Sequence, residues 1–290
     1  MIVEYILEVE NVYKKLDSFL LENIDFKLEP GYIMALIGIN GSGKTTLINT
    51  ILGLYQKTTG NIRICGHDLC LTESKAKGEI GFVLDENPFL EDVSSLDNAI
   101  IYSPYYKNFD LDMFLKYCSK FDVDPKKKLK KLSKGTIIKF QLAFALSHDA
   151  KLLVMDEPAS GLDPVFRREL MEIMYDEILN GEKSILFSTH LTEEIDMVAD
   201  YVTLIHEGKQ ILSTSKEELF ESYRIAKGSK EKIQMLDSCV IGKKETPYFV
   251  EALVKNEESI LNKGCEIELP TIADFMYYLT KDKREVLTYV

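Results

Sequence analysis

Hydrophobic positions along most of the chain form short apolar runs that alternate with amphipathic segments. Continuous apolar runs are typical of strands buried on both faces of a sheet, whereas apolar residues three and four apart are typical of helices. The predicted strands are Ile6–Val12, Phe19–Leu28, Ile33–Ile37, Gly60–Ile64, Ile80–Leu84, Lys151–Met155, Ser184–Ser188 and Tyr201–Ile205. The predicted helices are Thr45–Leu52, Leu96–Tyr102, Leu111–Phe121, Thr136–Ser147, Val165–Leu179, Glu193–Ala199 and Ser215–Tyr223. This alternation indicates an α/β fold with a mainly parallel sheet.

Two stretches of the chain depart from the alternation. Between about residues 86 and 147 the patterns are helical, which predicts a helical insertion into the α/β core. After Lys209 the pattern weakens, and short strands are followed by a last predicted helix, Ile272–Thr280. We therefore expect an α/β domain over residues 1–222 and a small C-terminal accessory domain over residues 223–290.

Charge and hydropathy narrow the classes of partner and location. The formal net charge is −12, and a strongly acidic chain is repelled by nucleic acid, so we expect no nucleic-acid partner. The apolar runs are short beside the ~20 residues of a membrane helix. The N-terminal residues Met1–Tyr5 lack a basic segment ahead of an apolar core, so they do not resemble a secretion signal. These features predict a cytoplasmic protein.

A glycine-rich segment follows the predicted strand Ile33–Ile37 and leads into a predicted helix. Its residues, Gly38-Ile39-Asn40-Gly41-Ser42-Gly43-Lys44-Thr45, fit the phosphate-loop pattern GxxxxGK[ST]. Glycines let successive N–H groups point inward, and the helix adds its positive N-terminal end. Lys44 supplies a charge for the β- and γ-phosphates, and the Thr45 hydroxyl is a ligand for Mg²⁺. We therefore predict an ATP and Mg²⁺ site that extends to Thr46.

Two adjacent carboxylates end the predicted strand Lys151–Met155. Asp156 is the expected Mg²⁺ ligand, and Glu157 is the expected base that deprotonates the attacking water. Because the carboxyl ends of parallel strands meet at one edge of a sheet, we expect this strand to neighbour the strand of the phosphate loop. Alone, the pair could be a polar end to a buried strand, but together with the phosphate loop it predicts ATP hydrolysis.

Further motifs make residues 1 to about 220 resemble an ATPase subunit of the ABC family. Leu132-Ser133-Lys134-Gly135-Thr136 resembles the family signature LSGGQ, with Lys134 and Thr136 in place of a glycine and the glutamine. The resemblance implies that Ser133 and Gly135 contact ATP bound to the opposite subunit, and Ser133 also suits a helix N-cap. Ser160-Gly161-Leu162-Asp163 resembles the D-loop, which places Asp163 at the dimer interface. His190 resembles the catalytic switch histidine that contacts the γ-phosphate.

Two positions differ from the family pattern. Where the family has a glutamine that touches Mg²⁺ and the attacking water, this chain has Asp85, a further candidate metal ligand that adds charge beside Asp156 and Glu157. The position that matches the aromatic residue for adenine stacking is Leu16, with Tyr13 and Phe19 as neighbours. We therefore expect an apolar contact with adenine rather than a stacked one.

The resemblance also implies an architecture and a function. The expected fold is a P-loop NTPase core with a mainly parallel sheet, an antiparallel β-subdomain, the helical insertion and a small α+β C-terminal module. The expected protein is an ATP-hydrolysing subunit of an ABC transporter, most similar to type 2 bacterial exporters of the bacitracin-resistance and antimicrobial-peptide kind. It would power export of a peptide, drug or lipid-like substrate. Its expected partners are transmembrane permease subunits, which hold it at the inner face of the cell membrane, and an identical or paralogous ATPase.

Two alternatives remain at this point. The altered signature and the missing glutamine are compatible with a slow-turnover regulatory or immunity-type ABC ATPase. A soluble ABC ATPase that takes no part in transport is the less favoured alternative, because the chain has one cassette, no sustained heptads and an acidic charge.

Overall fold

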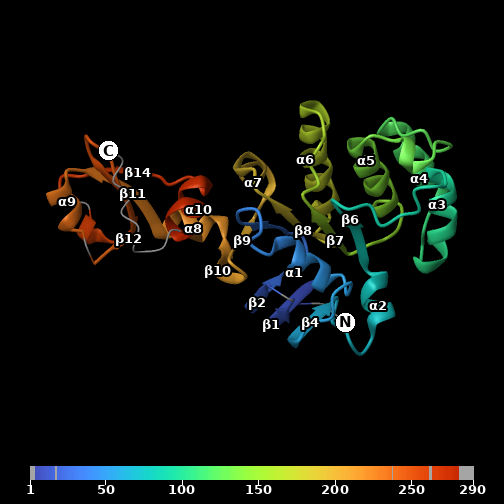
Figure 1. Ribbon diagram of the computed structural model, residues 1–290, viewed down its shortest axis with the longest axis horizontal. Coiled ribbons are helices and arrows are strands. Elements are labelled where there is room, and N and C mark those ends of the chain that lie inside the picture. Colours follow the sequence, from blue (N-terminus) through green and yellow to red (C-terminus); the bar gives the residue numbers. More distant parts are fainter. Residues whose placement is uncertain (1–3, 17, 237, 261–262, 281–290) are drawn as a thin grey trace.

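The computed structural model describes residues 4–16, 18–236, 238–260 and 263–280, which form an elongated molecule with two sheets (Figure 1). The larger sheet has ten strands in the order β5-β4-β1-β2-β10-β9-β3-β8-β7-β6. The smaller sheet has four strands in the order β12-β13-β11-β14. The smaller sheet and the helices α3 to α5 lie at opposite ends of the molecule, with the larger sheet between them.

The centre of the larger sheet is parallel. Its strands are β9 (Tyr201–His206), β3 (Ile33–Ile37), β8 (Ser184–Thr189), β7 (Leu152–Asp156) and β6 (Ile80–Val83). Every residue of β3, β7 and β8 is buried, as the continuous apolar runs of β3 and of Leu152–Met155 in β7 predict. The expectation that the strand of Asp156 neighbours that of the phosphate loop is wrong, because β8 lies between them. Strands buried on both faces carry no periodic signal that ranks their order in a sheet.

Antiparallel strands extend the sheet on the side of β9. They are β1 (Leu7–Lys15), β2 (Leu20–Leu28), β4 (Thr59–Ile64), β5 (His67–Asp68) and β10 (Lys209–Ser215). β10 joins the two parts, since it pairs antiparallel with β9 and parallel with β2. At this junction the Gln210 side chain accepts from Asp25 N–H at 2.9 Å and donates to Asp25 C=O at 2.6 Å.

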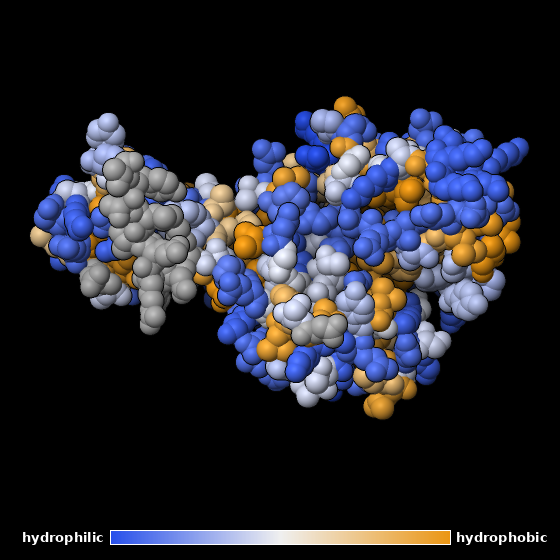
Figure 2. Space-filling model, in the orientation of Figure 1, coloured by the Kyte–Doolittle hydropathy of each residue, from blue (hydrophilic) through white to orange (hydrophobic). Residues whose placement is uncertain are grey.

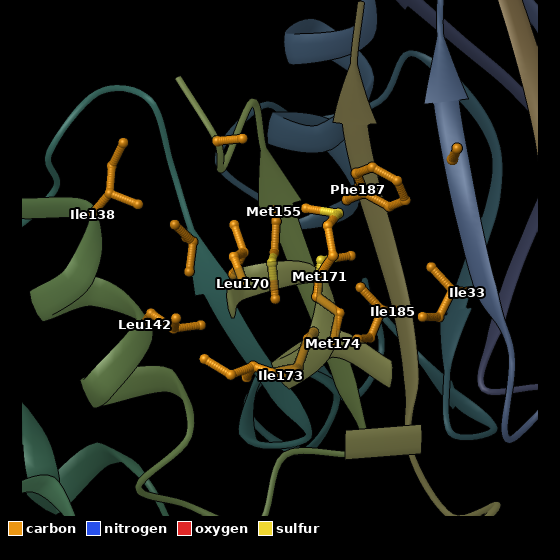
Figure 3. Packing of buried hydrophobic residues seen from close by; sticks show 14 of the residues in the cluster. Ile33, Ile138, Leu142, Met155, Leu170, Met171, Ile173, Met174, Ile185 and Phe187 are labelled. Carbon is orange, nitrogen blue, oxygen red and sulfur yellow. The ribbon is translucent and has the colours of Figure 1, made fainter. Parts of the chain in front are cut away.

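Helices lie on both faces of the larger sheet. They are α1 (Lys44–Ile51), α2 (Glu73–Gly78), α6 (Pro164–Ile178), α7 (Thr192–Val198) and α8 (Lys216–Ser222). Alternate residues of β7 point to opposite faces, so that Leu152 and Val154 pack in one cluster with α1, and Leu153 and Met155 pack in the other with α6. Figure 3 shows the second cluster, in which the apolar side of α6 lies on β7 and β8. The phosphate loop is thereby fixed between a rigid strand and a packed helix.

The helical insertion lies between β6 and β7. It contains α3 (Ser95–Tyr102), α4 (Leu111–Lys120) and α5 (Lys134–Ala145), with 3₁₀ turns at Ser103–Tyr105 and Leu129–Lys131. Phe89 is at its centre, with ring centroids 4.9 Å from Phe140, 5.1 Å from Phe144 and 5.2 Å from Tyr102. Because this aromatic cluster joins α3 and α5 to the segment after β6, the insertion is a packed unit.

The smaller sheet has a separate apolar layer on each face. Its elements are β11 (Tyr223–Gly228), β12 (Val240–Glu245), β13 (Val250–Lys255), β14 (Glu266–Glu268), α9 (Lys230–Gln234), the 3₁₀ turn Glu258–Ile260 and α10 (Ile272–Thr280). On one face Ala226 and Ala252 pack with Ile233 of α9. On the other face Leu253 packs in the cluster that contains α10, whose Phe275 ring lies 5.9 Å from that of Phe220 in α8. Since α10 also lies against α7, it connects the smaller sheet to the rest of the molecule.

The predicted fold class is confirmed, with a large mixed sheet, helices on its faces and a separate antiparallel sheet. In the described ranges, no helix is both long enough and apolar enough to cross a bilayer.

Candidate nucleotide site

The phosphate-loop segment connects β3 to α1 in a conformation that requires glycine at two positions. Gly38 has φ 155° and Gly43 has φ 114°. A Cβ atom at Gly38 would lie 2.3 Å from the carbonyl oxygen of Ile205 in β9, and one at Gly43 would lie 2.7 Å from the Phe19 ring. The glycines therefore allow the loop to lie directly against its neighbours and to turn into α1.

A pocket of about 540 Å³ opens beside this loop. Its lining residues are Phe19, Asn40, Gly41, Ser42, Gly43, Lys44, Thr45, Thr46, Asp85, Glu157, Ser160 and His190. Its volume is in the range of small-molecule sites, and the N-terminus of α1 adds a positive end. Of the predicted ATP-binding residues, Gly38 and Ile39 do not line the pocket; the Gly38 carbonyl instead accepts a hydrogen bond from Lys44 Nζ at 2.8 Å.

Two side chains of the loop are buried with their polar groups at the pocket. Lys44 is 6% exposed, and its Nζ lies 3.6 Å from Glu157 Oε1. Ser42 Oγ is buried and has no hydrogen-bond partner among the described residues. This oxygen packs against the loop backbone, because a Cβ atom added at Gly38 would lie 2.6 Å from it.

The acidic pair is held by hydrogen bonds from β8. Ser188 Oγ donates to Asp156 Oδ1 at 2.6 Å and accepts from Glu157 N–H at 2.9 Å. Glu157 has φ 48°, a left-handed conformation that is rare outside glycine and is concentrated at functional sites. Its Oε2 lies 2.8 Å from Nδ1 of His190. The structure thus brings Lys44, Glu157 and His190 together, as the sequence predicted.

The oxygen ligands near the loop suit a hard divalent cation. Thr45 lines the pocket on the first turn of α1, while Asp156 is 3% exposed and lies behind Glu157 at the end of β7. Among the described residues, no group of three or more His, Cys, Asp or Glu side chains could hold a metal ion. Hydroxyl and carboxylate ligands that leave positions for phosphate oxygens are the arrangement that Mg²⁺ prefers.

The signature segment lies outside this pocket, at the exposed N-terminus of α5. Ser133 is confirmed as the N-cap, since its Oγ accepts from Thr136 N–H at 3.2 Å. A Cβ at Gly135 would lie 2.7 Å from the carbonyl oxygen of Gly161, so the signature contacts the D-loop of the same chain. Neither Ser133 nor Gly135 is a lining residue of the chain's own pocket.

Asp163 of the predicted D-loop caps α6. Its Oδ1 accepts from Phe166 N–H at 3.0 Å and from Val165 N–H at 3.1 Å. The hydrogen bond from Phe166 N–H is the main cause that lowers the pKa of Asp163. The capping role is therefore visible in the single chain, and the carboxylate is exposed.

Two features of the site were not predicted from the sequence. Phe19 lines the pocket, whereas Leu16 and Tyr13 do not. Its aromatic character and its place just before β2 were the only signals, because its approach to Gly43 depends on the hairpin between β1 and β2. Asp85 lines the pocket and forms an ion pair with Lys134, a contact between positions far apart in the chain.

Comparison with known proteins agrees with this geometry. The family model described as ABC transporter matches residues 21–160. The chain is 30% identical over 225 residues to the lantibiotic transport ATP-binding protein SrtF of Streptococcus pyogenes, covering 74% of this chain and 96% of that protein. It is 30% identical over 192 residues to the bacitracin transport ATP-binding protein BcrA of Bacillus licheniformis, covering 65% of this chain and 62% of that protein. A solved ATP-binding subunit of an ABC transporter superposes with a TM-score of 0.68 at 24% identity, covering 74% of this chain and 91% of that one.

The chain therefore belongs to the ABC transporter ATP-binding family. Within that family it is an ATP-binding subunit of a transporter and an ATPase. The resemblance to the ATPases of antimicrobial-peptide and bacitracin transporters is confirmed by the two relatives.

Proposed function

We propose that this subunit hydrolyses ATP with Glu157 as the base and thereby powers export of a peptide, drug or lipid-like substrate. The observation that carries the proposal is the position of Glu157, whose two carboxylate oxygens lie beside Lys44 and His190 in the pocket below the phosphate loop. A carboxylate between a phosphate-binding lysine and a histidine can orient and deprotonate water at the terminal phosphate. The named relatives support an antimicrobial peptide as the substrate class.

The other residues have complementary roles in this proposal. The residues from Gly38 to Thr46 bind the phosphates. Thr45 and Asp156 would hold Mg²⁺, which neutralises charge on the β- and γ-phosphates when bound. His190 contacts the γ-phosphate, and Phe19 contacts adenine.

A second ATPase subunit, identical or paralogous, completes the site. Ser133 and Gly135, which do not line the chain's own pocket, would contact the nucleotide of that subunit, as the family signature does. Val165, two residues after Asp163, is 79% exposed, which supports an interface at the D-loop.

The permease subunits dock, in this proposal, on the side of the helical insertion, and this contact holds the protein at the inner face of the membrane. An apolar cleft of about 140 Å³ lies there, lined by Leu52, Leu54, Lys77, Ile80, Phe82, Leu84, Pro88 and Tyr106. Figure 2 shows further hydrophobic surface along the insertion, where Ile100 and Ile101 are 52% and 44% exposed. Exposed apolar surface of this kind is typical of a protein interface.

Residues 223–290 form, in this proposal, an accessory domain. The separate sheet and the cluster around Ala226 and Ile233 support a unit with its own core.

The variant Glu157→Gln tests the catalytic assignment. We expect ATP binding to remain within about twofold and steady-state hydrolysis to fall at least about 100-fold, because the amide cannot take the proton. The measurements are nucleotide titration by calorimetry and phosphate release. Glu172→Gln, an exposed change on α6, is the matched control and should hydrolyse at the wild-type rate. Unchanged hydrolysis by the Glu157 variant would show that another group is the base.

A further inference from the structure

Helix α5 holds the segment that leaves β6 at two points on one helix face. Gln141 is buried; it accepts from Leu84 N–H at 2.8 Å and donates to the Leu84 carbonyl at 2.9 Å. Seven residues earlier on α5, about two helical turns, Lys134 forms an ion pair with Asp85. The helix that begins with the signature is therefore attached to two consecutive residues at the edge of the nucleotide pocket.

Lys134 connects two walls of that pocket without lining it. Its Nζ pairs with Asp85 and lies 3.4 Å from Oγ of Ser160 in the D-loop. Both Asp85 and Ser160 are lining residues of the pocket. Lys134 directly follows the N-cap Ser133, so it lies at the end of α5 that carries the signature.

The charges of Asp85 and Lys134 are opposite, so each offsets the other. Asp85 adds a carboxylate to a pocket wall that already has Glu157, with Asp156 behind it. Lys134 supplies the opposite charge and forms an ion pair with Asp85. The family pattern has a neutral residue at both positions, so the two departures of this chain are opposite in sign and in contact.

We propose that Lys134 is a positioning residue, which couples Asp85 of the chain's own nucleotide pocket to the Ser133–Gly135 segment that serves the partner's nucleotide. The inference rests on the proposed function, because it assigns a link between the two ATP sites. The side chains of Lys134 and Asp85 are 50% and 42% exposed, so the pair contributes little to folding stability. The Lys134–Asp85 pair instead sets the position of the signature segment when nucleotide fills the pocket.

A double-mutant cycle on the full chain tests this coupling. We expect Asp85→Gln and Lys134→Gly each to lower kcat about tenfold with KM changed less than about twofold, because each leaves one unpaired charge between the sites. The double variant D85Q/K134G removes both charges and should return to within about threefold of the wild-type kcat. Melting temperature should be the same in all four proteins, which separates positioning from folding.

A second exposed pair provides the control. Lys130, in the 3₁₀ turn before α5, pairs with Asp92 ahead of α3, and neither residue lines the pocket, so Lys130→Gly and Asp92→Asn should leave kcat unchanged. The proposal is overturned if either single variant has the wild-type kcat, or if the double variant is as slow as the product of the two single effects. Absence of Glu157-dependent hydrolysis in the wild-type protein would instead reject the proposed function, and the coupling with it.

Discussion

At the scale of single residues, the phosphate-binding groups could be predicted because they are consecutive in the chain. The glycine-rich pattern specified a loop whose Lys44 and Ser42 are indeed buried at a pocket. Contacts between distant residues could not be predicted in this way. Asp85 and Lys134 looked like two separate departures from a pattern, and only the packing of α5 on β6 brings them together. The same holds for Phe19, whose ring meets Gly43 through a hairpin.

Replacement of Lys44 by alanine tests the phosphate-binding assignment. Lys44 is the buried cation beside the loop, so we expect Lys44→Ala to weaken ATP binding at least about tenfold, or ~1.4 kcal/mol. Titration calorimetry measures the affinity, and thermal unfolding checks that the variant folds. Lys75→Ala on α2 removes a lysine that does not line the pocket and should bind as the wild type does. Equal affinities for all three proteins would refute the role of Lys44.

At the scale of elements, apolar runs and helical periodicity predicted the parallel strands and most helices. They did not predict β10, whose residues are only partly buried and show no alternation. This strand is stabilised by its ladder with β9 and by the Gln210 contacts to β2, which are non-local. Strand order was missed for a related reason, since pairing of fully buried strands is decided by the helices and loops that connect them.

The contact between α5 and β6 predicts a pH dependence of stability. His148, just after α5, is buried; its Nε2 lies 3.1 Å from the Ile80 carbonyl oxygen. Burial lowers the pKa of His148 below the ordinary value of 6.5, so the folded state binds fewer protons than the unfolded state. The contribution of neutral His148 to the free energy of unfolding is fully present above pH ~6.5. It is lost as the pH falls through the pKa of His148 in the folded state.

We therefore expect the melting temperature of the wild type to fall between pH 7.5 and 5.5, and that of His148→Gln to fall less steeply. Thermal unfolding followed by circular dichroism at a series of pH values measures both slopes. His67→Gln, in the short strand β5, should keep the wild-type slope. If the His148 variant also keeps the wild-type slope of melting temperature against pH, the buried imidazole is not the group whose titration lowers stability.

At the scale of the whole molecule, the weak hydrophobic pattern after Lys209 led us to expect a separate C-terminal part. It did not predict how that part packs against the ATPase core. The apolar cluster of the ATPase core continues through α8 into α10, which lies against α7. The cluster contains residues that are distant in sequence, such as Ile195 and Phe275. No local sequence pattern predicts that such residues share a cluster.

Removal of residues 223–290 tests whether the ATPase core is independent of the accessory part. We expect residues 1–222 to fold and to bind ATP within about threefold of the full chain, because no described residue beyond His190 lines the pocket. Exposure of the α7 and α8 surfaces should cost about 1–3 kcal/mol and lower the melting temperature by several degrees. Phe275→Ala in the full chain is a companion variant that loosens the same junction without deleting it. Loss of ATP binding by the shortened chain would place the boundary elsewhere.

The strand β8, which separates β3 from β7, sets the width of the catalytic centre. Two ladder spacings of ~4.8 Å place the phosphate loop and the acidic pair about 10 Å apart at the level of the backbone. That width is a property of the sheet, and it does not vary with side-chain rotamers. A triphosphate bound by the phosphate loop therefore has to reach Glu157 across the end of β8, over a distance fixed by the pairing of three strands.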